Sequence, residues 1–156
     1  MKTVTVLSDT HGNRRAMEKL DTVLAESDYI IHLGDTSGDG AYLRHMYGAK
    51  TFIVNGNCDT AKLGENEIVT QIEDVKIFAT HGHLYSAKQT LLKLADRAES
   101  LGCAVALYGH THYAREDAIG NVTLINPGCM TRYSANSYCY LVINGARFTH
   151  KIVDTQ

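Results

Sequence analysis

Short runs of β-branched and other apolar residues recur along the chain, and helix-like patterns separate several of them. In the first two-thirds, the strand-like runs cover residues 3–7, 29–33, 51–54, 67–70, 75–79 and 104–108. Helical periodicity covers residues 13–26, 41–46 and 87–100, and Asn13 stands where it can cap the first of these helices. This alternation predicts βαβ units with parallel strands.

The pattern changes after residue 112. Strand-like segments then follow one another closely, at residues 113–117, 122–125, 137–143 and 147–153, with turn-forming pairs at 120–121 and 144–145. We therefore expect an α/β (α+β) protein with two mixed β-sheets packed face to face and flanked by helices, a four-layer αββα sandwich. Tyr133, Tyr138 and Tyr140 fall in or near strand-like sequence and are expected to pack in a sheet.

Composition narrows the class of protein. The 156 residues carry a formal net charge of −2, which offers no extended nucleic-acid surface. No apolar run approaches the roughly 20 residues that cross a bilayer. Residues 1–156 are expected to form a single domain. With no signal-peptide pattern and four cysteines outside any CxxC spacing, we expect a cytoplasmic protein with free thiols. The sequence leaves a homo-oligomer open.

Five polar clusters begin within a few residues of the ends of strand-like runs. They are Asp9-Thr10-His11, Gly34-Asp35, Asn55-Gly56-Asn57-Cys58-Asp59, His81-Gly82-His83 and Gly109-His110-Thr111-His112. Ligand sites in α/β sheets lie at the carboxyl ends of parallel strands. One such cluster alone is most often polar surface, whereas five at strand ends are difficult to explain in that way. We therefore expect them to meet at one site.

The composition of these clusters indicates a metal site. Residues two apart on an extended segment point to the same side, so Asp9 and His11 could reach one ion, and so could His110 and His112. The glycines of the clusters allow tight turns beside the site. Imidazole and carboxylate ligands together suit zinc, manganese or iron better than calcium.

The order DxH, GD, GN, H and GHxH resembles the calcineurin-like metallophosphoesterase superfamily. The variants at residues 56–59 and 81–83 resemble the small bacterial and archaeal phosphodiesterases related to the retromer subunit of the vacuolar protein-sorting pathway. The resemblance implies that one metal is held by Asp9, His11 and His112 and that Asp35 bridges two metals. It assigns the second metal to the remaining family positions, Asn57, His81 and His110.

The resemblance also implies an activity. A dinuclear centre with a bridging hydroxide would attack phosphorus in line with the leaving group. We expect two divalent ions, manganese foremost, with nickel, zinc, iron or magnesium as alternatives, and a small phosphodiester as substrate.

Three residues are candidates for a catalytic role: Cys58, Asp59 and His83. Many members of the superfamily carry histidine at the position of Cys58, and that histidine is thought to protonate the leaving group. A thiol is a weaker acid than an imidazolium, so we expect a preference for esters with good leaving groups. His83 could replace the missing acid or could support a metal ligand.

Two other functions compete with this interpretation. The retromer subunit keeps the fold but works mainly as a scaffold, so a non-catalytic interaction protein is the first alternative. A zinc hydrolase of the metallo-β-lactamase type is the second, but it needs an HxHxDH run, and no aspartate follows His81-Gly82-His83 in the next three residues. His32, inside an apolar run, is expected to be buried and to support the site without binding metal.

Overall fold

The computed structural model describes residues 1–155 and contains two five-stranded sheets. Its elements, in chain order, are β1 (Lys2–Leu7), α1 (Arg14–Glu18), α2 (Asp21–Glu26), β2 (Tyr29–His32), α3 (Ser37–Tyr47), η1 (Gly48–Lys50), β3 (Thr51–Ile53), β4 (Glu67–Ile72), β5 (Val75–Thr80), η2 (His83–Tyr85), α4 (Leu92–Ser100), β6 (Val105–Leu107), β7 (Arg115–Ile119), β8 (Val122–Asn126), β9 (Asn136–Asn144) and β10 (Arg147–Thr155).

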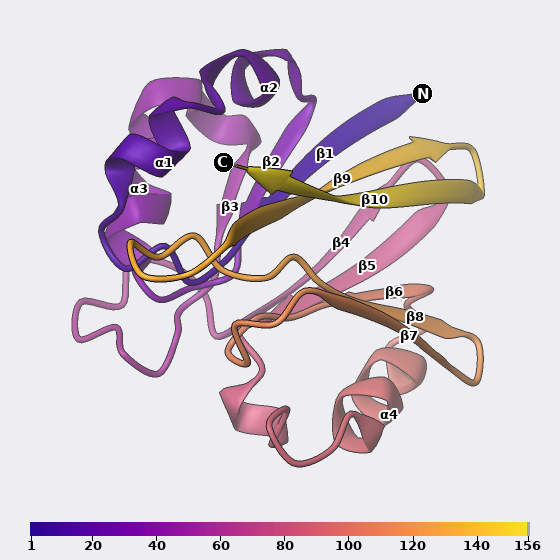
Figure 1. The fold of residues 1–156 in the computed structure, drawn as a ribbon. Coiled ribbons are helices and arrows are strands. Elements are labelled where there is room, and N and C mark those ends of the chain that lie inside the picture. The colour runs from indigo at the N-terminus through magenta and orange to yellow at the C-terminus, as the bar shows by residue number, and fades with distance from the viewer. Residues whose placement is uncertain (156) are drawn as a thin grey trace.

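The first sheet has the strand order β10-β9-β1-β2-β3 and the second has β4-β5-β6-β8-β7. Strands β1, β2 and β3 are parallel, β9 pairs with β1 in antiparallel fashion, and β10 pairs with β9 in antiparallel fashion. In the second sheet β5, β6 and β8 are parallel, with antiparallel β4 and β7 at the edges. Figure 1 shows helices α1, α2 and α3 on one side of the two sheets and α4 on the opposite side. The four-layer mixed sandwich expected from the sequence is confirmed.

Period-two alternation along the strands builds the core. Val6 of β1 and Ile77 of β5 lie in the cluster between the sheets, which also takes in Leu107 of β6 and Leu141 of β9. Every second residue faces the opposite way, as in β-strands generally. The parallel strands are consequently apolar on both faces, and this is why they appear in the sequence as continuous apolar runs.

The outward faces are covered by helices. Met17, Leu24 and Leu43, from α1, α2 and α3 respectively, pack on the outer side of the first sheet. On the second sheet, Leu94 and Ala98 of α4 do the same. None of the helices within residues 1–155 is long and apolar enough to cross a membrane.

The helix expected over residues 13–26 is two short helices. The backbone N–H of Leu20 bonds to the carbonyl of Met17, three residues back, and residues 19 and 20 form a turn between α1 and α2. Asn13 precedes α1 but does not cap it through its side chain. Its amide nitrogen donates instead to the carbonyl of Met130. The Asn13 side chain, which the local sequence predicts to cap the helix, makes a tertiary hydrogen bond instead.

Other boundaries also differ from the expectation. The helix expected over residues 87–100 begins only at Leu92, whose backbone N–H donates to the hydroxyl of Thr90. Helix α3 starts at Ser37, four residues earlier than expected. The turns at 120–121 and 144–145 do join antiparallel neighbours, β7 to β8 and β9 to β10. The sequence pattern therefore locates the strands well, whereas the ends of the helices depend on tertiary contacts.

Candidate metal centre

The loops that follow five parallel strands meet at one edge of the sandwich. From the first sheet come the loops after β1, β2 and β3, and from the second come the loops after β5 and β6. The residues on these loops are Asp9, His11, Asp35, Asn57, His81, His110 and His112. The site is therefore assembled from both sheets, with carboxylates from the first and three imidazoles from the second.

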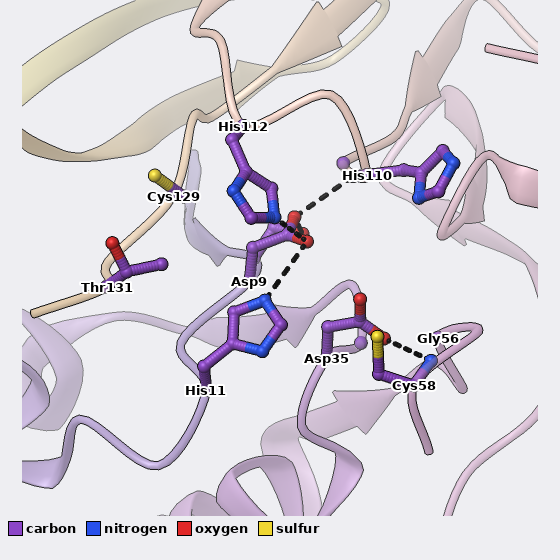
Figure 2. Close-up of polar contacts among 12 residues, drawn as sticks. Asp9, His11, Asp35, Gly56, Cys58, His110, His112, Cys129 and Thr131 are labelled. Carbon is purple, nitrogen blue, oxygen red and sulfur yellow. Dashed lines mark hydrogen bonds and ion pairs between the residues drawn. The ribbon is translucent and has the colours of Figure 1, made fainter. Parts of the chain in front are cut away.

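Asp9, His11 and His112 form a group that we call the rim cluster. Their ligand atoms lie within 4.8 Å of one another. Nε2 of His112 is 3.1 Å from Oδ1 of Asp9, and Nε2 of His11 is 3.9 Å from the same oxygen. Figure 2 shows both imidazoles turned toward Asp9 from opposite sides. The two histidine side chains are 34% and 43% exposed, so this cluster is open to solvent.

Asp9, Asp35 and His81 form a second group, the buried cluster, in which all three residues are enclosed. Nε2 of His81 lies 3.3 Å from Oδ2 of Asp35 and 3.9 Å from Oδ1 of Asp9. The same nitrogen is 3.0 Å from Oδ1 of Asn57. On the other side of the ring, Nδ1 donates to the carbonyl of Leu33 at 2.7 Å. That bond leaves Nε2 to face the oxygens, as in many histidine ligands.

His110 is oriented differently from His112. Its backbone N–H donates to Oδ2 of Asp9 at 3.0 Å, but Figure 2 shows its ring directed away from that carboxylate. The ring centroid is 5.1 Å from that of His81 and 6.1 Å from that of His83. His110 therefore lies beside the Asn57–His81 side of the site. The idea that alternation brings His110 and His112 to one ion is wrong, because this segment is a turn and not extended strand.

Left-handed backbone is concentrated at these residues. Among residues 1–155 there are seven non-glycine residues with positive φ, and five of them are predicted ligands. They are Asp9 (52°), His11 (44°), Asp35 (48°), His110 (69°) and His112 (66°). Such conformations cost on the order of 1–3 kcal/mol each and cluster at functional sites. The Asp9–His11 spacing therefore works through a tight turn, and the extended geometry expected from the sequence is not what joins these side chains.

Two glycines allow the loops to approach this closely. A Cβ on Gly109 would clash with the hydroxyl of Ser8 and the carboxylate of Asp9. A Cβ on Gly56 would clash with the carboxylate of Asp35. Both positions therefore admit only a hydrogen beside a predicted ligand, which agrees with the expected role of the motif glycines.

The Asp9 carboxylate provides a test of whether the site fits a cation. Its Oδ2 accepts hydrogen bonds from the Ser8 hydroxyl and the His110 backbone N–H. Its Oδ1 is fully buried and receives no well-directed hydrogen bond from the described residues, although Nε2 of His112 lies 3.1 Å away. A buried anionic oxygen is costly unless a cation satisfies it, either a protonated imidazole or a metal ion held by the neutral imidazoles. This oxygen belongs to both clusters, so the donor set fits divalent metal ions.

Electrostatics point the same way. Burial acts to raise the pKa of Asp35, but the contact with His81 outweighs it and holds that pKa well below its usual range. Burial acts to lower the pKa of His81, whereas Asp35 and Asp9 raise it further than burial lowers it. Burial and the neighbouring His81 lower the pKa of His110 to about 4. His110 is consequently neutral near pH 7, the form that binds metal.

Asp59 and Cys58 lie beside Asp35 in different ways. The Asp59 carboxylate accepts backbone N–H bonds from Asp35, Ser37 and Gly56 at 2.7–3.1 Å. It thus joins the loop after β3 to the loop after β2, which favours a positioning role for Asp59 over contact with a substrate. Cys58 donates its backbone N–H to Oδ1 of Asp35, and its side chain is exposed (Figure 2).

A buried network that sequence reasoning missed supports both carboxylate loops. The Thr10 hydroxyl donates to Oδ2 of Asp39 at 2.5 Å and lies 2.9 Å from Nε2 of His32. Gly34 donates its N–H to Nδ1 of His32, and Gly12 donates its N–H to Asp39. His32 is buried, as its apolar context predicts. The sequence does not indicate a role for Asp39, because this residue lies in a polar stretch that is not predicted to belong to helix α3.

A cleft of about 890 Å³ opens beside the rim cluster. His11 and His112 form part of its wall, and the loops on either side contribute Tyr113, Arg132 and Tyr133. Cys129 and Thr131 also line it, and Figure 2 shows both next to the histidines. The rim cluster is therefore accessible to a small molecule.

Comparison with protein families decides the class of this site. The calcineurin-like phosphoesterase superfamily domain matches residues 1–146. The chain belongs to this superfamily. It is 39% identical over 129 residues to the probable metallophosphoesterase YsnB of Bacillus subtilis, covering 80% of this chain and 73% of the relative. Over 148 residues it is 30% identical to the phosphodiesterase MJ0936 of Methanocaldococcus jannaschii, covering 79% and 81%.

Solved structures agree. A predicted phosphoesterase from Streptococcus pneumoniae superposes with a TM-score of 0.83 at 27% identity, covering 98% of this chain and 89% of the other. Vacuolar Protein Sorting 29 from Cryptosporidium parvum superposes with a TM-score of 0.80 at 18% identity, covering 99% and 97%. At that identity the second likeness concerns the fold alone. The family resemblance drawn from the sequence motifs is confirmed, and the family is metal-dependent.

Proposed function

We propose that the protein is a phosphodiesterase that uses two divalent ions. The observation that carries the proposal is Oδ1 of Asp9, a buried oxygen at the meeting point of both clusters, which three imidazole nitrogens face at 3.1–3.9 Å. Two groups of donors that meet at this oxygen suit two neighbouring cations, one beside each group. The superfamily and the relative named as a phosphodiesterase support the reaction class.

In this proposal each ion takes ligands from both sheets. Asp9, His11 and His112 would hold the rim ion, and Asp35 would contribute its carboxylate to both ions. Asn57, His81 and His110 hold the other ion. The amide of Asn57 is neutral, and that matters for the charge balance. With two carboxylates, two divalent cations and one hydroxide, the centre keeps one net positive charge for an anionic ester, which a third carboxylate would cancel.

When bound, the two ions supply a hydroxide nucleophile at neutral pH and positive charge next to the phosphoryl oxygens. In hydrolysis, the hydroxide oxygen would bond to phosphorus while the bond from phosphorus to one ester oxygen would break. The released oxygen keeps the bonding electrons and takes up a proton. The products are a phosphate monoester and an alcohol or phenol. Asp9 and Asp35 remain ionised throughout, because their pKa values are lowered.

The chain offers weak acids for the leaving group. Burial and the nearby Asp35 raise the pKa of the Cys58 thiol. Burial and the neighbouring His81 lower the pKa of His83, so its imidazole is largely neutral at pH 7. Neither group is a strong proton donor there. We expect aryl diesters to be hydrolysed faster than alkyl diesters.

A Cys58→His variant tests this preference. General-acid help is worth roughly 10²–10⁴-fold, so the variant should gain rate on a diester with a poor alkyl leaving group. It should gain little on bis(p-nitrophenyl) phosphate, whose leaving group needs no proton. Cys58→Ser is the matched control. Equal rates for the histidine variant and the wild type on the alkyl ester would contradict the explanation.

The function itself is tested with a panel of chromogenic phosphodiesters and monoesters, each with manganese, nickel, zinc and magnesium. Metal content is measured on the same samples. Asp35→Ala is the key variant, because removing the shared carboxylate should abolish turnover. A wild-type protein that binds two ions but hydrolyses none of the esters would point instead to a scaffold of the retromer-subunit type. Full activity of Asp35→Ala would disprove the bridging role.

A further inference from the structure

Two tyrosine rings stand exposed at the mouth of the cleft beside the rim cluster. Tyr133, on the loop between β8 and β9, is 96% exposed, and Tyr113, on the loop between β6 and β7, is 77% exposed. Both line the cleft whose wall includes His11 and His112. The expectation that Tyr133 packs in a sheet is wrong, because residues 127–135 form a loop. Tyr138 does lie in β9 and is buried.

The loop under Tyr133 is held by its own hydrogen bonds. The hydroxyls of Thr131 and Ser134 are 2.7 Å apart, and Ser134 also contacts the thiol of Cys129 at 3.1 Å. The backbone N–H of Tyr133 points to the Thr131 hydroxyl. A structured loop thus presents a large aromatic side chain that contributes little to the core. Exposed aromatic side chains can act as platforms on which flat ligands such as nucleobases stack.

Cationic side chains lie in the cleft and in a groove next to it. Arg132 lines the cleft and also a neighbouring groove of about 550 Å³, to which Arg15 and Lys19 contribute. The two hollows share Thr131 and Ser134 as well. An elongated anion that enters from the rim cluster would therefore meet first the tyrosines and then a group of cations.

We propose that the cleft binds the flat aromatic group of a phosphodiester against Tyr113 and Tyr133, with Arg132 taking a further anionic group. The substrate class is an aryl or nucleoside phosphodiester, and a short dinucleotide satisfies both features. The volume of about 890 Å³ lies within the range of small-molecule sites. The position of the reacting phosphate rests on the proposed function, but the aromatic subsite can be measured without turnover.

The first experiment compares ligands that differ only in the flat group. Adenosine 5′-monophosphate and ribose 5-phosphate are titrated by calorimetry into the manganese-loaded protein. Phenyl phosphate and methyl phosphate form a second pair. Stacking on aromatic side chains should make the aromatic member of a pair bind roughly tenfold more tightly. A preference in the first pair points to a nucleobase, and a preference in the second pair alone points to an aryl ester.

Variants then assign that preference to the tyrosines. In a Tyr113→Ala/Tyr133→Ala double variant the affinity ratio should fall toward one, while the two corresponding phenylalanine substitutions should preserve it. Leu92→Ala, at an exposed apolar position on α4, is the surface control. Equal affinities within both ligand pairs in the wild type, or an unchanged ratio in the double alanine variant, would overturn the aromatic subsite.

Arg132 is tested with two dinucleotides, ApA and pApA, which differ by one terminal phosphate. The wild type should hydrolyse pApA with a several-fold higher kcat/KM, mainly through KM, and Arg132→Gln should remove that advantage. Arg147→Gln, at an exposed position on β10, is the control. No difference between the dinucleotides in the wild type would overturn the role of Arg132. If no diester is hydrolysed but adenosine monophosphate is still preferred, the proposed reaction fails and the aromatic subsite stands.

Discussion

His81 and His112 both face Oδ1 of Asp9, but they are held in different ways. The His81 side chain is fully buried, with one ring nitrogen fixed by the Leu33 carbonyl and the other beside Asp35. The His112 side chain is 43% exposed, and it contacts Asp9 through an ion pair and the His11 ring at a centroid distance of 5.3 Å. The buried cluster is thus placed by packing and by partners on every side. The rim cluster is placed by backbone turns and remains open to substrate.

The largest expected effect is a difference in stability between variants of the two histidines. In the presence of a chelator, His81→Ala should lower the free energy of unfolding by about 3–5 kcal/mol, because it leaves buried carboxylates without their partner. His112→Ala should cost less, roughly 1–2 kcal/mol, because its imidazole is partly exposed and His11 and His81 still face the same Asp9 oxygen. Urea denaturation of the two variants and the wild type measures the difference. Equal losses would show that the two clusters are supported alike.

Metal binding sharpens the same contrast. Manganese at 100 times its dissociation constant should stabilise the wild type by about 2.7 kcal/mol for each site. We expect two ions in the wild type and one in His112→Ala, with the remaining ion in the buried cluster. Thermal melts with and without chelator, combined with metal analysis, provide the numbers. A His112→Ala protein that binds no ion would mean that the clusters cannot be filled separately.

Gly109→Ala tests how tightly the turns pack against Asp9. The added methyl group would clash with Ser8 and Asp9, so we expect a loss of about 1–3 kcal/mol together with weaker manganese binding. Gly120→Ala is the matched control, because Gly120 has a positive φ but nothing within 4 Å of the added atom. It should lose about 1 kcal/mol and bind manganese normally. Normal metal binding by Gly109→Ala would contradict the close approach.

The smallest effect is a pH dependence in the metal-free protein. Because the pKa of His81 is raised by Asp35 and Asp9, its protonated form stabilises the fold. That contribution is complete below its unfolded pKa of about 6.5 and is lost as the pH rises through the folded value. The stability gap between the wild type and His81→Gln should therefore narrow from pH 6 upward. A gap that is constant or widens would contradict the assigned contacts.

The residues that were predicted well share one property. Val6, Ile31 and Ile77 lie in strands whose two faces are both buried, so hydrophobic pattern alone located them. The motif residues could be assigned to strand ends for the same reason. Tertiary contacts decided the rest. The Asn13 amide bonds to Met130, more than a hundred residues away, and nothing local to Asn13 indicates that choice.

The orientation of the ligand side chains could not be predicted from the sequence, because it also depends on tertiary contacts. The left-handed turns at Asp9 and His110 are imposed by hydrogen bonds between loops of different strands, such as the one from the Asp9 N–H to the Gly34 carbonyl. The sequence neighbours of Tyr133 favour a strand, whereas the loop of residues 127–135 keeps Tyr133 outside the sheet. Pattern identified which residues matter and not which way they point.

The division of the ligands between two sheets has a consequence for the order of folding and metal binding. The loops after β1 and β2 supply both carboxylates, but each cluster needs an imidazole from beyond β5. A nascent chain that has not yet reached His81 can complete neither cluster. Tight retention of a cation would then report that the two layers have docked. During refolding, metal uptake would consequently follow the formation of secondary structure and coincide with packing of the two sheets against each other.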